Sequence, residues 1–442
     1  MTLLRGTGSA NGGSSGLMEK EMTSRYVDVV GRVLSEAERG FPTDEQETPF
    51  VIEPLESTTT EFLSDFLSRH SEQVLADIAK HGALLIRGFD IASSAEFERL
   101  FLSIRGMTGM DELLLSEAGR TLTDGTRFVF HTNALIKTGG AANFDDFHSE
   151  NYFAPDVPHY IGFFCLTPSD LGGETGLVNL RKVYADLPDR LKQELERGAC
   201  FAARYALEDM ERRYRLPAHA IEAFCEEVGL PIVSEDGVDY VAIHKPSVIE
   251  HPVTQEKVLL LNFFNIPNLL ESLVSRFMPD YQGKEWFRHR LIWRFPQLAA
   301  LVHPDGVLRT LYRRARYRTA HRAGSNAQFA IKGQRWVGTL LTSDDIQLIA
   351  ESIRRRFSSF RWKAGDLLIL DNLQIAHAGM PGRGKRVMRV MLCNPVPLPY
   401  SAASPGLHRV VETGESLTTL GRRLIDLRDA HPAGTGEPIG AK

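Results

Sequence analysis

The sequence predicts a mainly β domain to which helices have been added. Residues 127–178 and 360–398 consist of short apolar or aromatic segments separated by Gly, Asn, Asp and Pro, which is typical of strands joined by functional loops. Between them, from Leu187 to about Arg322, apolar residues recur mostly at helical spacing among many charges. We therefore expect a β barrel interrupted by an inserted helical lid over residues 187 to about 330.

Two helical stretches and a buried strand are predicted before the barrel. Apolar residues recur at helical spacing from Glu61 to His81, and the apolar run Ala83 to Ile86 that follows indicates a buried strand. Ser93 and Glu96 have the spacing of a capping box, and the residues after them keep one apolar helical face.

The chain is expected to form one elaborated domain over residues 23–400, because its length permits a large core. Residues 1–22 are rich in Gly and Ser, a composition that buries too little surface to offset the entropy of ordering, and they are expected to form a disordered leader. The C-terminal tail, residues 401–442, has too little pattern to assign.

Charge and composition exclude several classes of partner. A net charge of -5 gives no overall attraction to nucleic acid or to anionic lipid, and no apolar run approaches the length needed to cross a membrane. The scattered cysteines suggest neither a zinc site nor a disulfide framework, so a cytoplasmic location is expected. These cysteines are Cys165, Cys200, Cys225 and Cys393.

The first candidate metal-ligating segment contains His148 and Glu150. In an extended chain, residues i and i+2 project from the same face, so this imidazole and carboxylate can hold one ion. Such a pair is common without a metal, and its interpretation depends on a third ligand.

His377 is the candidate third ligand, since it follows a buried strand that barrel closure could bring back to the first two. Two imidazoles and one carboxylate suit iron(II) and leave three coordination positions open, enough for a bidentate co-substrate and O2. The helical His-Glu-x-x-His spacing of many zinc hydrolases is absent. His131, His159 and His244 are interpreted as surface or structural residues.

A co-substrate such as 2-oxoglutarate would need an arginine to neutralise its second carboxylate inside an apolar barrel. Arg386 and Arg389 both follow His377. The period-2 alternation of a strand places them on opposite faces, so only one can face the cavity. We expect this to be Arg386.

Four segments resemble the taurine dioxygenase and clavaminate synthase superfamily of iron(II)/2-oxoglutarate oxygenases. The resemblance implies a double-stranded β-helix, the cupin-like jelly roll, with N-terminal helices outside it. It also implies metal binding by His148, Glu150 and His377, and co-substrate binding by Thr175 and Arg386. The matching segments are His81 to Phe89, His148 to Glu150, Gly172 to Thr175, and Trp362 to Arg389.

The same resemblance suggests a reaction class. Family members with Glu at the position of Glu150 resemble amino-acid hydroxylases and desaturases of natural-product pathways, and this carboxylate argues against the halogenases of the family. Residues 377–382 depart from the usual family pattern, in which the distal histidine is followed by Gly-Arg and then an aromatic residue. A non-oxidative metal-dependent hydrolase or a cupin-like isomerase with the same ligands stays open.

The basic stretch from Arg309 to Arg322 has two interpretations. It can be the solvated, ion-paired face of a helix, or it can dock an acidic carrier protein that bears the substrate. The small-molecule substrate is therefore expected to be either free or carrier-bound, and the sequence leaves the oligomeric state open.

Overall fold

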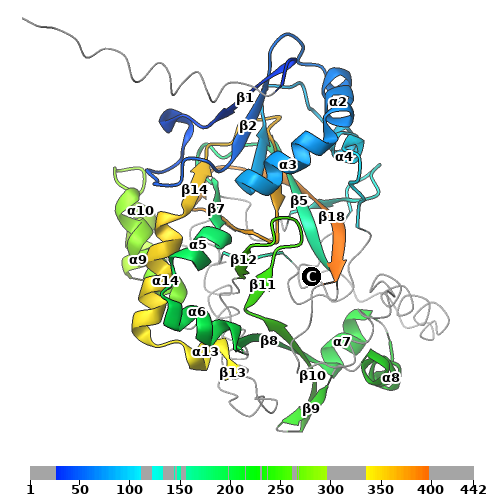
Figure 1. The fold of residues 1–442 in the computed structure, drawn as a ribbon, viewed down its shortest axis with the longest axis vertical. Helices are drawn as coiled ribbons and strands as arrows, with labels where there is room; N and C mark the ends of the chain where they lie inside the picture. The colour runs from blue at the N-terminus through cyan, green and yellow to red at the C-terminus, as the bar shows by residue number, and fades with distance from the viewer. Residues whose placement is uncertain are drawn as a thin grey trace, which may run out of the picture.

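Two β-sheets that pack face to face form the centre of the protein (Figure 1). The larger sheet has the strand order β1-β2-β3-β15-β5-β18-β4, and the smaller one has the order β14-β7-β16. The computed structural model describes residues 26–110, 122–132, 144, 147–150, 156–197, 199–214, 216–228, 231–235, 237–260, 266, 268–295 and 335–397.

The larger sheet is antiparallel except for the β2–β3 pair. Its strand β15 shows how the sheet separates two cores: Leu367 and Ile369 pack toward helices, whereas Leu368 and Leu370 pack toward the smaller sheet. The predicted buried strand at 83–86 is confirmed as β3, and β15 and β18 lie in the segment 360–398, where strands were expected. The strands are β1 (Val29–Val33), β2 (Phe50–Pro54), β3 (Ala83–Ile86), β15 (Leu367–Asp371), β5 (Asp156–Thr167), β18 (Val387–Pro397) and β4 (Val129–His131).

The smaller sheet closes over the inner face of the larger one. Leu177, Phe360 and Ile375 of the smaller sheet share one buried cluster with residues of β5, β15 and β18. Two facing, largely antiparallel sheets of this kind form a double-stranded β-helix, so the predicted jelly roll is confirmed. The strands are β14 (Phe357–Phe360), β7 (Thr175–Asn179) and β16 (Ile375–Gly379), beside the short pair β6 (Leu171–Gly172) and β17 (Gly382–Arg383).

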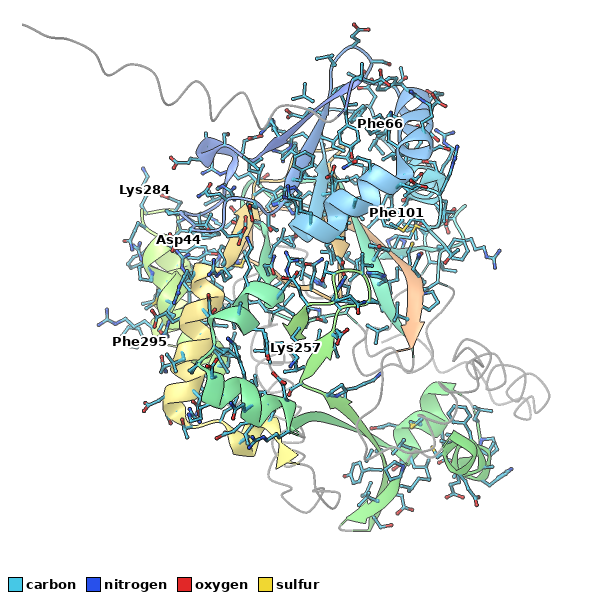
Figure 2. All side chains as sticks on the ribbon, viewed as in Figure 1. Asp44, Phe66, Phe101, Lys257, Lys284 and Phe295 are labelled. Carbon is cyan, nitrogen blue, oxygen red and sulfur yellow. The ribbon has the colours of Figure 1, made fainter. Side chains whose placement is uncertain are left out.

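Helices α2 (Thr60–Arg69), α3 (Ser71–His81) and α4 (Ser94–Ser103) cover the outer face of the larger sheet, where Figure 2 shows Phe66 and Phe101. The predicted helical stretch from 61 to 81 is two helices, because His70 leaves the helical conformation. The capping box is confirmed, since the Ser93 hydroxyl accepts a hydrogen bond from the Glu96 amide.

The insertion contains helices, as expected, and also strands that the apolar spacing did not reveal. Strand β8 pairs with β10, which pairs with β9, and β11 forms a hairpin with β12. Two of these pairings, β9–β10 and β11–β12, are short hairpins, whereas β8 and β10 pair across the helices α7 and α8, which a local pattern does not report. The elements from 187 to 295 are α6 (Asp189–Glu196), β8 (Ala199–Ala206), α7 (Leu207–Tyr214), α8 (Ala218–Val228), β9 (Ile232–Glu235), β10 (Val238–Pro246), β11 (Val248–Glu250), β12 (Lys257–Leu259), α9 (Leu269–Phe277), η4 (Met278–Asp280) and α10 (Phe287–Arg294).

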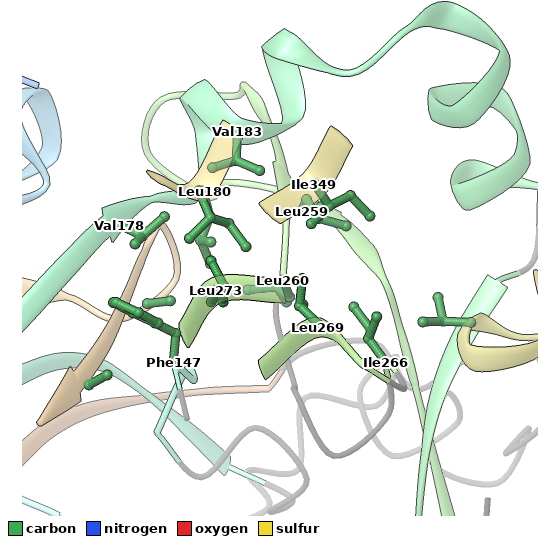
Figure 3. Packing of buried hydrophobic residues seen from close by; sticks show 14 of the residues in the cluster. Phe147, Val178, Leu180, Val183, Leu259, Leu260, Ile266, Leu269, Leu273 and Ile349 are labelled. Carbon is green, nitrogen blue, oxygen red and sulfur yellow. The ribbon is translucent and has the colours of Figure 1, made fainter. Parts of the chain in front are cut away.

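Helices next to the insertion bind it to the barrel through a shared apolar cluster. Leu180 and Val183 of α5 and Ile349 of α14 pack with Leu259 of β12 (Figure 3). The helices are α5 (Leu180–Asp186), α13 (Val337–Leu340) and α14 (Ser343–Arg355), with β13 (Arg335–Trp336) and the 3-10 turn η1 (Glu36–Glu38) completing the elements.

Three of the segments interpreted from the sequence cannot be compared with the structure. The leader, the basic stretch from Arg309 to Arg322 and the tail from 401 lie outside the described residues. Within the described part, no helix is both long enough and apolar enough to span a bilayer. Cys165, Cys225 and Cys393 are buried free thiols, and burial raises the pKa of the Cys165 thiol to about 12.

A buried ion pair joins the N-terminal part of the larger sheet to the turn before β15. Arg87 is 2% exposed and donates to both oxygens of Asp366, at 3.0 and 2.6 Å. We expect Arg87→Met to lower the free energy of unfolding by about 3–5 kcal/mol, because it leaves a carboxylate buried without its cation. Urea unfolding measures the loss. Arg69→Met breaks solvent-screened surface pairs and should change the free energy of unfolding far less. Equal losses for the two variants would contradict the assignment.

Candidate metal centre

The two ligand segments predicted from the sequence meet as a short antiparallel pair. The amide of His148 donates to the carbonyl of His377 at 3.1 Å, and the reverse bond measures 3.0 Å. Because β16 is the last strand of the smaller sheet, the His148 segment adds to its edge. Backbone pairing therefore holds the two histidines directly opposite each other.

Side chains from these segments converge on one point. Glu150 Oε2 lies 3.6 Å from His148 Nε2 and 3.6 Å from His377 Nε2, and one ligand atom from each residue lies within 4.8 Å of the others. Adjacent ligands of an octahedral ion are roughly 3 Å apart when metal–ligand bonds are about 2.1 Å. The three donors can therefore hold one ion after small side-chain adjustments.

Exposure differs among the three side chains. The His148 side chain is 38% exposed, whereas those of Glu150 and His377 are 6% and 8% exposed. Phe163 of β5 covers His377 edge to face, with ring centroids 5.1 Å apart. Solvent or a substrate can thus reach the site on the His148 side, while the barrel wall closes the other.

Asn372 fixes the backbone that carries Glu150. Its Oδ1 accepts from the Glu150 amide at 2.7 Å, and its Nδ2 donates to the carbonyls of Glu150 and Pro158 at 3.1 and 2.9 Å. The side-chain amide of Asn372 thus makes the two backbone hydrogen bonds to Glu150 that a neighbouring strand would otherwise make. Sequence reasoning did not predict this role; the available signal was a polar pair, Asp371 and Asn372, directly after a buried strand.

Phe147 anchors the same segment from the opposite direction. It is buried beside Val178 and Leu273 in the cluster that joins barrel and insertion (Figure 3). Its ring contacts Phe357 at 6.0 Å between centroids. Phe147, directly before His148, is therefore held by packing, and Glu150, two residues after His148, is held by the hydrogen bonds of Asn372.

Thr175 and Arg386, the predicted co-substrate residues, lie together inside the barrel. Arg386 Nη2 donates to Thr175 Oγ1 at 3.0 Å, and Trp362 Nε1 donates to the same oxygen at 3.2 Å. Thr175 and Leu177 share a face of β7, and Leu177 pairs with His377. The guanidinium therefore lies on the same side of the smaller sheet as the metal ligands.

The two hydrogen bonds also orient the threonine hydroxyl. A hydroxyl has two acceptor positions and one proton. Trp362 and Arg386 occupy both acceptor positions, so the Thr175 proton is left to donate to a third group. A carboxylate placed against Arg386 would accept it.

Arg389 points away from this cavity. Its Nε donates to Ser94 Oγ of α4 at 3.2 Å, on the helix-covered face of the larger sheet. The neighbouring Met388 and Val390 lie in the cluster between the two sheets. The structure thus places the two arginines on the two sides that strand alternation predicted.

Glu174 precedes Thr175 and faces the other way, toward the insertion. Its carboxyl is 5% exposed, and its Oε2 has no hydrogen-bond partner among the described residues. Burial raises the pKa of this carboxyl, because the charged form loses its hydration, and Arg361 and Arg386 offset this only in part. This polar residue contributes to the packing side of β7, not to the cavity.

A jelly roll with two histidines and one carboxylate at a common point fits the class of non-haem iron oxygenases. Residues 52–289 match the family model "Taurine catabolism dioxygenase TauD, TfdA family". The chain therefore belongs to this family and is an oxidoreductase that uses iron(II), 2-oxoglutarate and O2. The match includes His148, Glu150 and Thr175, whereas His377 and Arg386 lie beyond it.

Individual relatives are more distant. The chain is 23% identical over 362 residues to the dapdiamide synthesis protein DdaC of Enterobacter agglomerans, covering 80% of this chain and 92% of that protein. PvcB, an iron and α-ketoglutarate dependent oxygenase from an isonitrile synthetic pathway, is similar with 14% identity, a TM-score of 0.46, and coverage of 86% and 98%. A taurine dioxygenase from Burkholderia xenovorans has 13% identity, a TM-score of 0.41, and coverage of 86% and 99%.

We expect Glu174→Gln to become more stable than the natural protein as pH rises. A carboxyl whose folded pKa is raised keeps its proton when folded, so stability is full below the unfolded value of about 4.3 and falls as pH rises through the folded value. Glutamine cannot ionise and avoids this loss. Urea unfolding from pH 5 to 8 measures the difference, with the exposed Glu351→Gln as control. Parallel pH profiles for Glu174→Gln and the natural protein would contradict this prediction.

Proposed function

We propose that the protein hydroxylates or desaturates an amino-acid-like small molecule, with His148, Glu150 and His377 as iron(II) ligands. The observation that carries the proposal is the convergence of these three side chains, from segments far apart in the sequence, within 4.8 Å. Imidazole and carboxylate donors on one side of an ion leave its other positions open for a co-substrate and O2.

Thr175 and Arg386 would hold the far carboxylate of 2-oxoglutarate. Arg386 offers the planar fork of donors that suits a carboxylate, and the Thr175 proton adds one further bond. Trp362 keeps the threonine oxygen in place through its indole N–H. These contacts would favour a diacid over keto acids that lack a second carboxylate.

When bound, iron(II) with 2-oxoglutarate and O2 supplies the oxidising power to break an unactivated C–H bond, with succinate and CO2 as co-products. The chain binds and orients the reactants around it. Phe163 and the apolar residues between the sheets exclude water from the closed side of the site. Asn372 and the His148–His377 backbone bonds keep the ligands in register while substrate enters from the exposed side.

The relative named for dapdiamide synthesis supports a role in natural-product biosynthesis. The amino-acid-like substrate is proposed from the resemblance at Glu150 to amino-acid hydroxylases and desaturases. A halogenating enzyme of this family needs a free coordination position for the halide, where the carboxylate of Glu150 would bind here. The presence of Glu150 therefore supports hydroxylation or desaturation over halogenation. Whether the substrate is free or carried by a protein partner stays a prediction, as does a cytoplasmic location.

A non-oxidative hydrolase or isomerase is the alternative use of the same ligands. Family membership favours the oxygenase. We expect succinate to form from 2-oxoglutarate in air and not under argon, which mass spectrometry of the reaction measures together with a panel of candidate amino acids. Substrate turnover that is equal in both atmospheres and leaves 2-oxoglutarate intact would favour the alternative.

We expect anaerobic titration with iron(II) and 2-oxoglutarate to give one equivalent of bound metal and a visible charge-transfer band. Glu150→Ala and His377→Ala should each weaken metal binding by more than about 100-fold, since they remove a ligand and not merely a supporting contact. His219→Ala, which changes an exposed histidine of α8, should bind like the natural protein. A full band in the Glu150→Ala variant would exclude the proposed ligand set.

We expect Arg386→Met and Thr175→Val to weaken 2-oxoglutarate binding without loss of iron(II) affinity. A hydrogen bond to a charged group contributes about 1.5–3 kcal/mol, so Thr175→Val should raise the apparent Kd by about ten- to a hundredfold, and Arg386→Met by more. Arg389→Met is the matched control, because its guanidinium faces Ser94 outside the cavity. Anaerobic titration at fixed iron(II) measures the constants. An equal effect of Arg389→Met would contradict the assignment of Arg386 as the co-substrate residue.

A further inference from the structure

A second set of two histidines and one carboxylate lies in the protein. His159, His251 and Asp371 are all buried, and one ligand atom from each lies within 4.8 Å of the others. His251 Nε2 is 2.9 Å and His159 Nε2 is 3.5 Å from Asp371 Oδ2. This second set therefore offers the same donor groups as the candidate metal centre, two imidazoles and one carboxylate.

The position of one proton argues against a metal at this second set. The amides of Val253 and Thr254 donate to His251 Nδ1, at 3.2 and 3.1 Å. Nδ1 is therefore an acceptor and carries no proton, so the proton of the neutral ring is on Nε2. That nitrogen donates to Asp371 and has no lone pair to offer a metal.

Asp371 is an anion held by several donors. Besides His251, Gln374 Nε2 donates to Oδ2 at 2.9 Å and the Leu373 amide donates to Oδ1 at 3.1 Å. Burial disfavours the charged form, but the imidazoles of His159 and His251, whose Nε2 atoms lie 3.5 and 2.9 Å from Oδ2, outweigh it and hold the pKa of this carboxyl well below its usual range. The carboxylate thus ties together the turn that follows β15.

His251 reaches this turn from the insertion. It begins the loop of the β11–β12 hairpin, which the bond from its amide to the Glu256 carbonyl closes at 2.9 Å. Leu259 of β12 is buried against α5 and α14 (Figure 3), and Figure 1 shows the hairpin beside α5. The hairpin is therefore rooted in the insertion core, and its tip contacts the barrel at Asp371.

The turn that Asp371 organises leads to two proposed metal ligands. The next residue, Asn372, holds the backbone of Glu150. The turn ends at Gln374, directly before the strand β16 that carries His377. A displaced Asp371 carboxylate would therefore move the residue that holds Glu150 and the start of the strand that holds His377.

We propose that His251 is a positioning residue: its hydrogen bond to Asp371 couples the inserted hairpin to the turn that sets the spacing of Glu150 and His377. The inference rests on the proposed function, because it concerns the same metal ligands. It assigns the second His-His-Asp set to positioning and predicts a single metal site. Through the hydrogen bond from His251 to Asp371, a displacement of the inserted hairpin would change the affinity of the centre for its metal.

The test compares His251→Phe, which removes the donor, with His251→Gln, whose amide can still donate to Asp371. Cobalt(II), titrated without 2-oxoglutarate or O2, reports affinity and ligand geometry through its visible spectrum, independently of turnover. We expect His251→Phe to lower cobalt(II) affinity on the order of tenfold and to alter the spectrum, and His251→Gln to recover most of both. His70→Phe makes the same change at a half-buried histidine beside α2 and should bind cobalt(II) normally.

Thermal unfolding of the metal-free variants separates positioning from general destabilisation. The proposal is overturned if His251→Phe binds cobalt(II) with natural affinity and spectrum, or if His251→Gln gives no recovery although it unfolds at the natural temperature. It is also overturned if the natural protein binds a second equivalent that His251→Phe loses. A natural protein that binds no cobalt(II) would instead refute the proposed metal centre, so the two failures are distinguishable.

Discussion

The backbone pairing of His148 with His377 is the constraint on which the candidate site depends. Two reciprocal backbone hydrogen bonds join the short His148 segment to the edge of the smaller sheet. They hold the backbones of the two histidines opposite each other, so that both imidazoles start from fixed positions. Glu150, two residues after His148, brings its Oε2 atom to the same point, 3.6 Å from Nε2 of each histidine. An ion-binding site built this way inherits the rigidity of the sheet, and Asn372 and Phe147 secure the segment at its two ends.

Residue type alone does not distinguish the two His-His-carboxylate sets of this protein. At the candidate metal centre the side chain of His148 is partly exposed, so an ion and its further ligands have access. At the second set, backbone amides fix the tautomer of His251, and the carboxylate is already surrounded by donors. The protonation state and the access of solvent, which are properties of the folded environment, decide which set suits a metal.

The insertion serves the barrel in two physical ways. Its apolar cluster covers the outer side of the smaller sheet, where it also buries Glu174, and its hairpin contacts the turn before β16. The residues around the ligands are therefore supported from outside the barrel as well as within it. A cap that is packed in this manner can shape a substrate cavity while the ligand geometry is held by strands.

The sequence by itself predicted the N-terminal helices and placed Arg386 and Arg389 on opposite faces of one strand, because strand alternation and short-range spacing fix which face a residue occupies. The jelly roll and the co-substrate role of Thr175 came from the resemblance to a family, and the assignment of His148, Glu150 and His377 as metal ligands stays a prediction. The sequence did not reveal the strands of the insertion, the hold of Asn372 on Glu150, or the pairing of His251 with Asp371. The contacts of Asn372 and of His251 join segments far apart along the chain, and β8 pairs with β10 across two intervening helices, so these interactions form only when the chain has folded. The local sequence pattern predicts toward which face of a strand or helix a side chain points, whereas the tertiary structure determines which residue it contacts there.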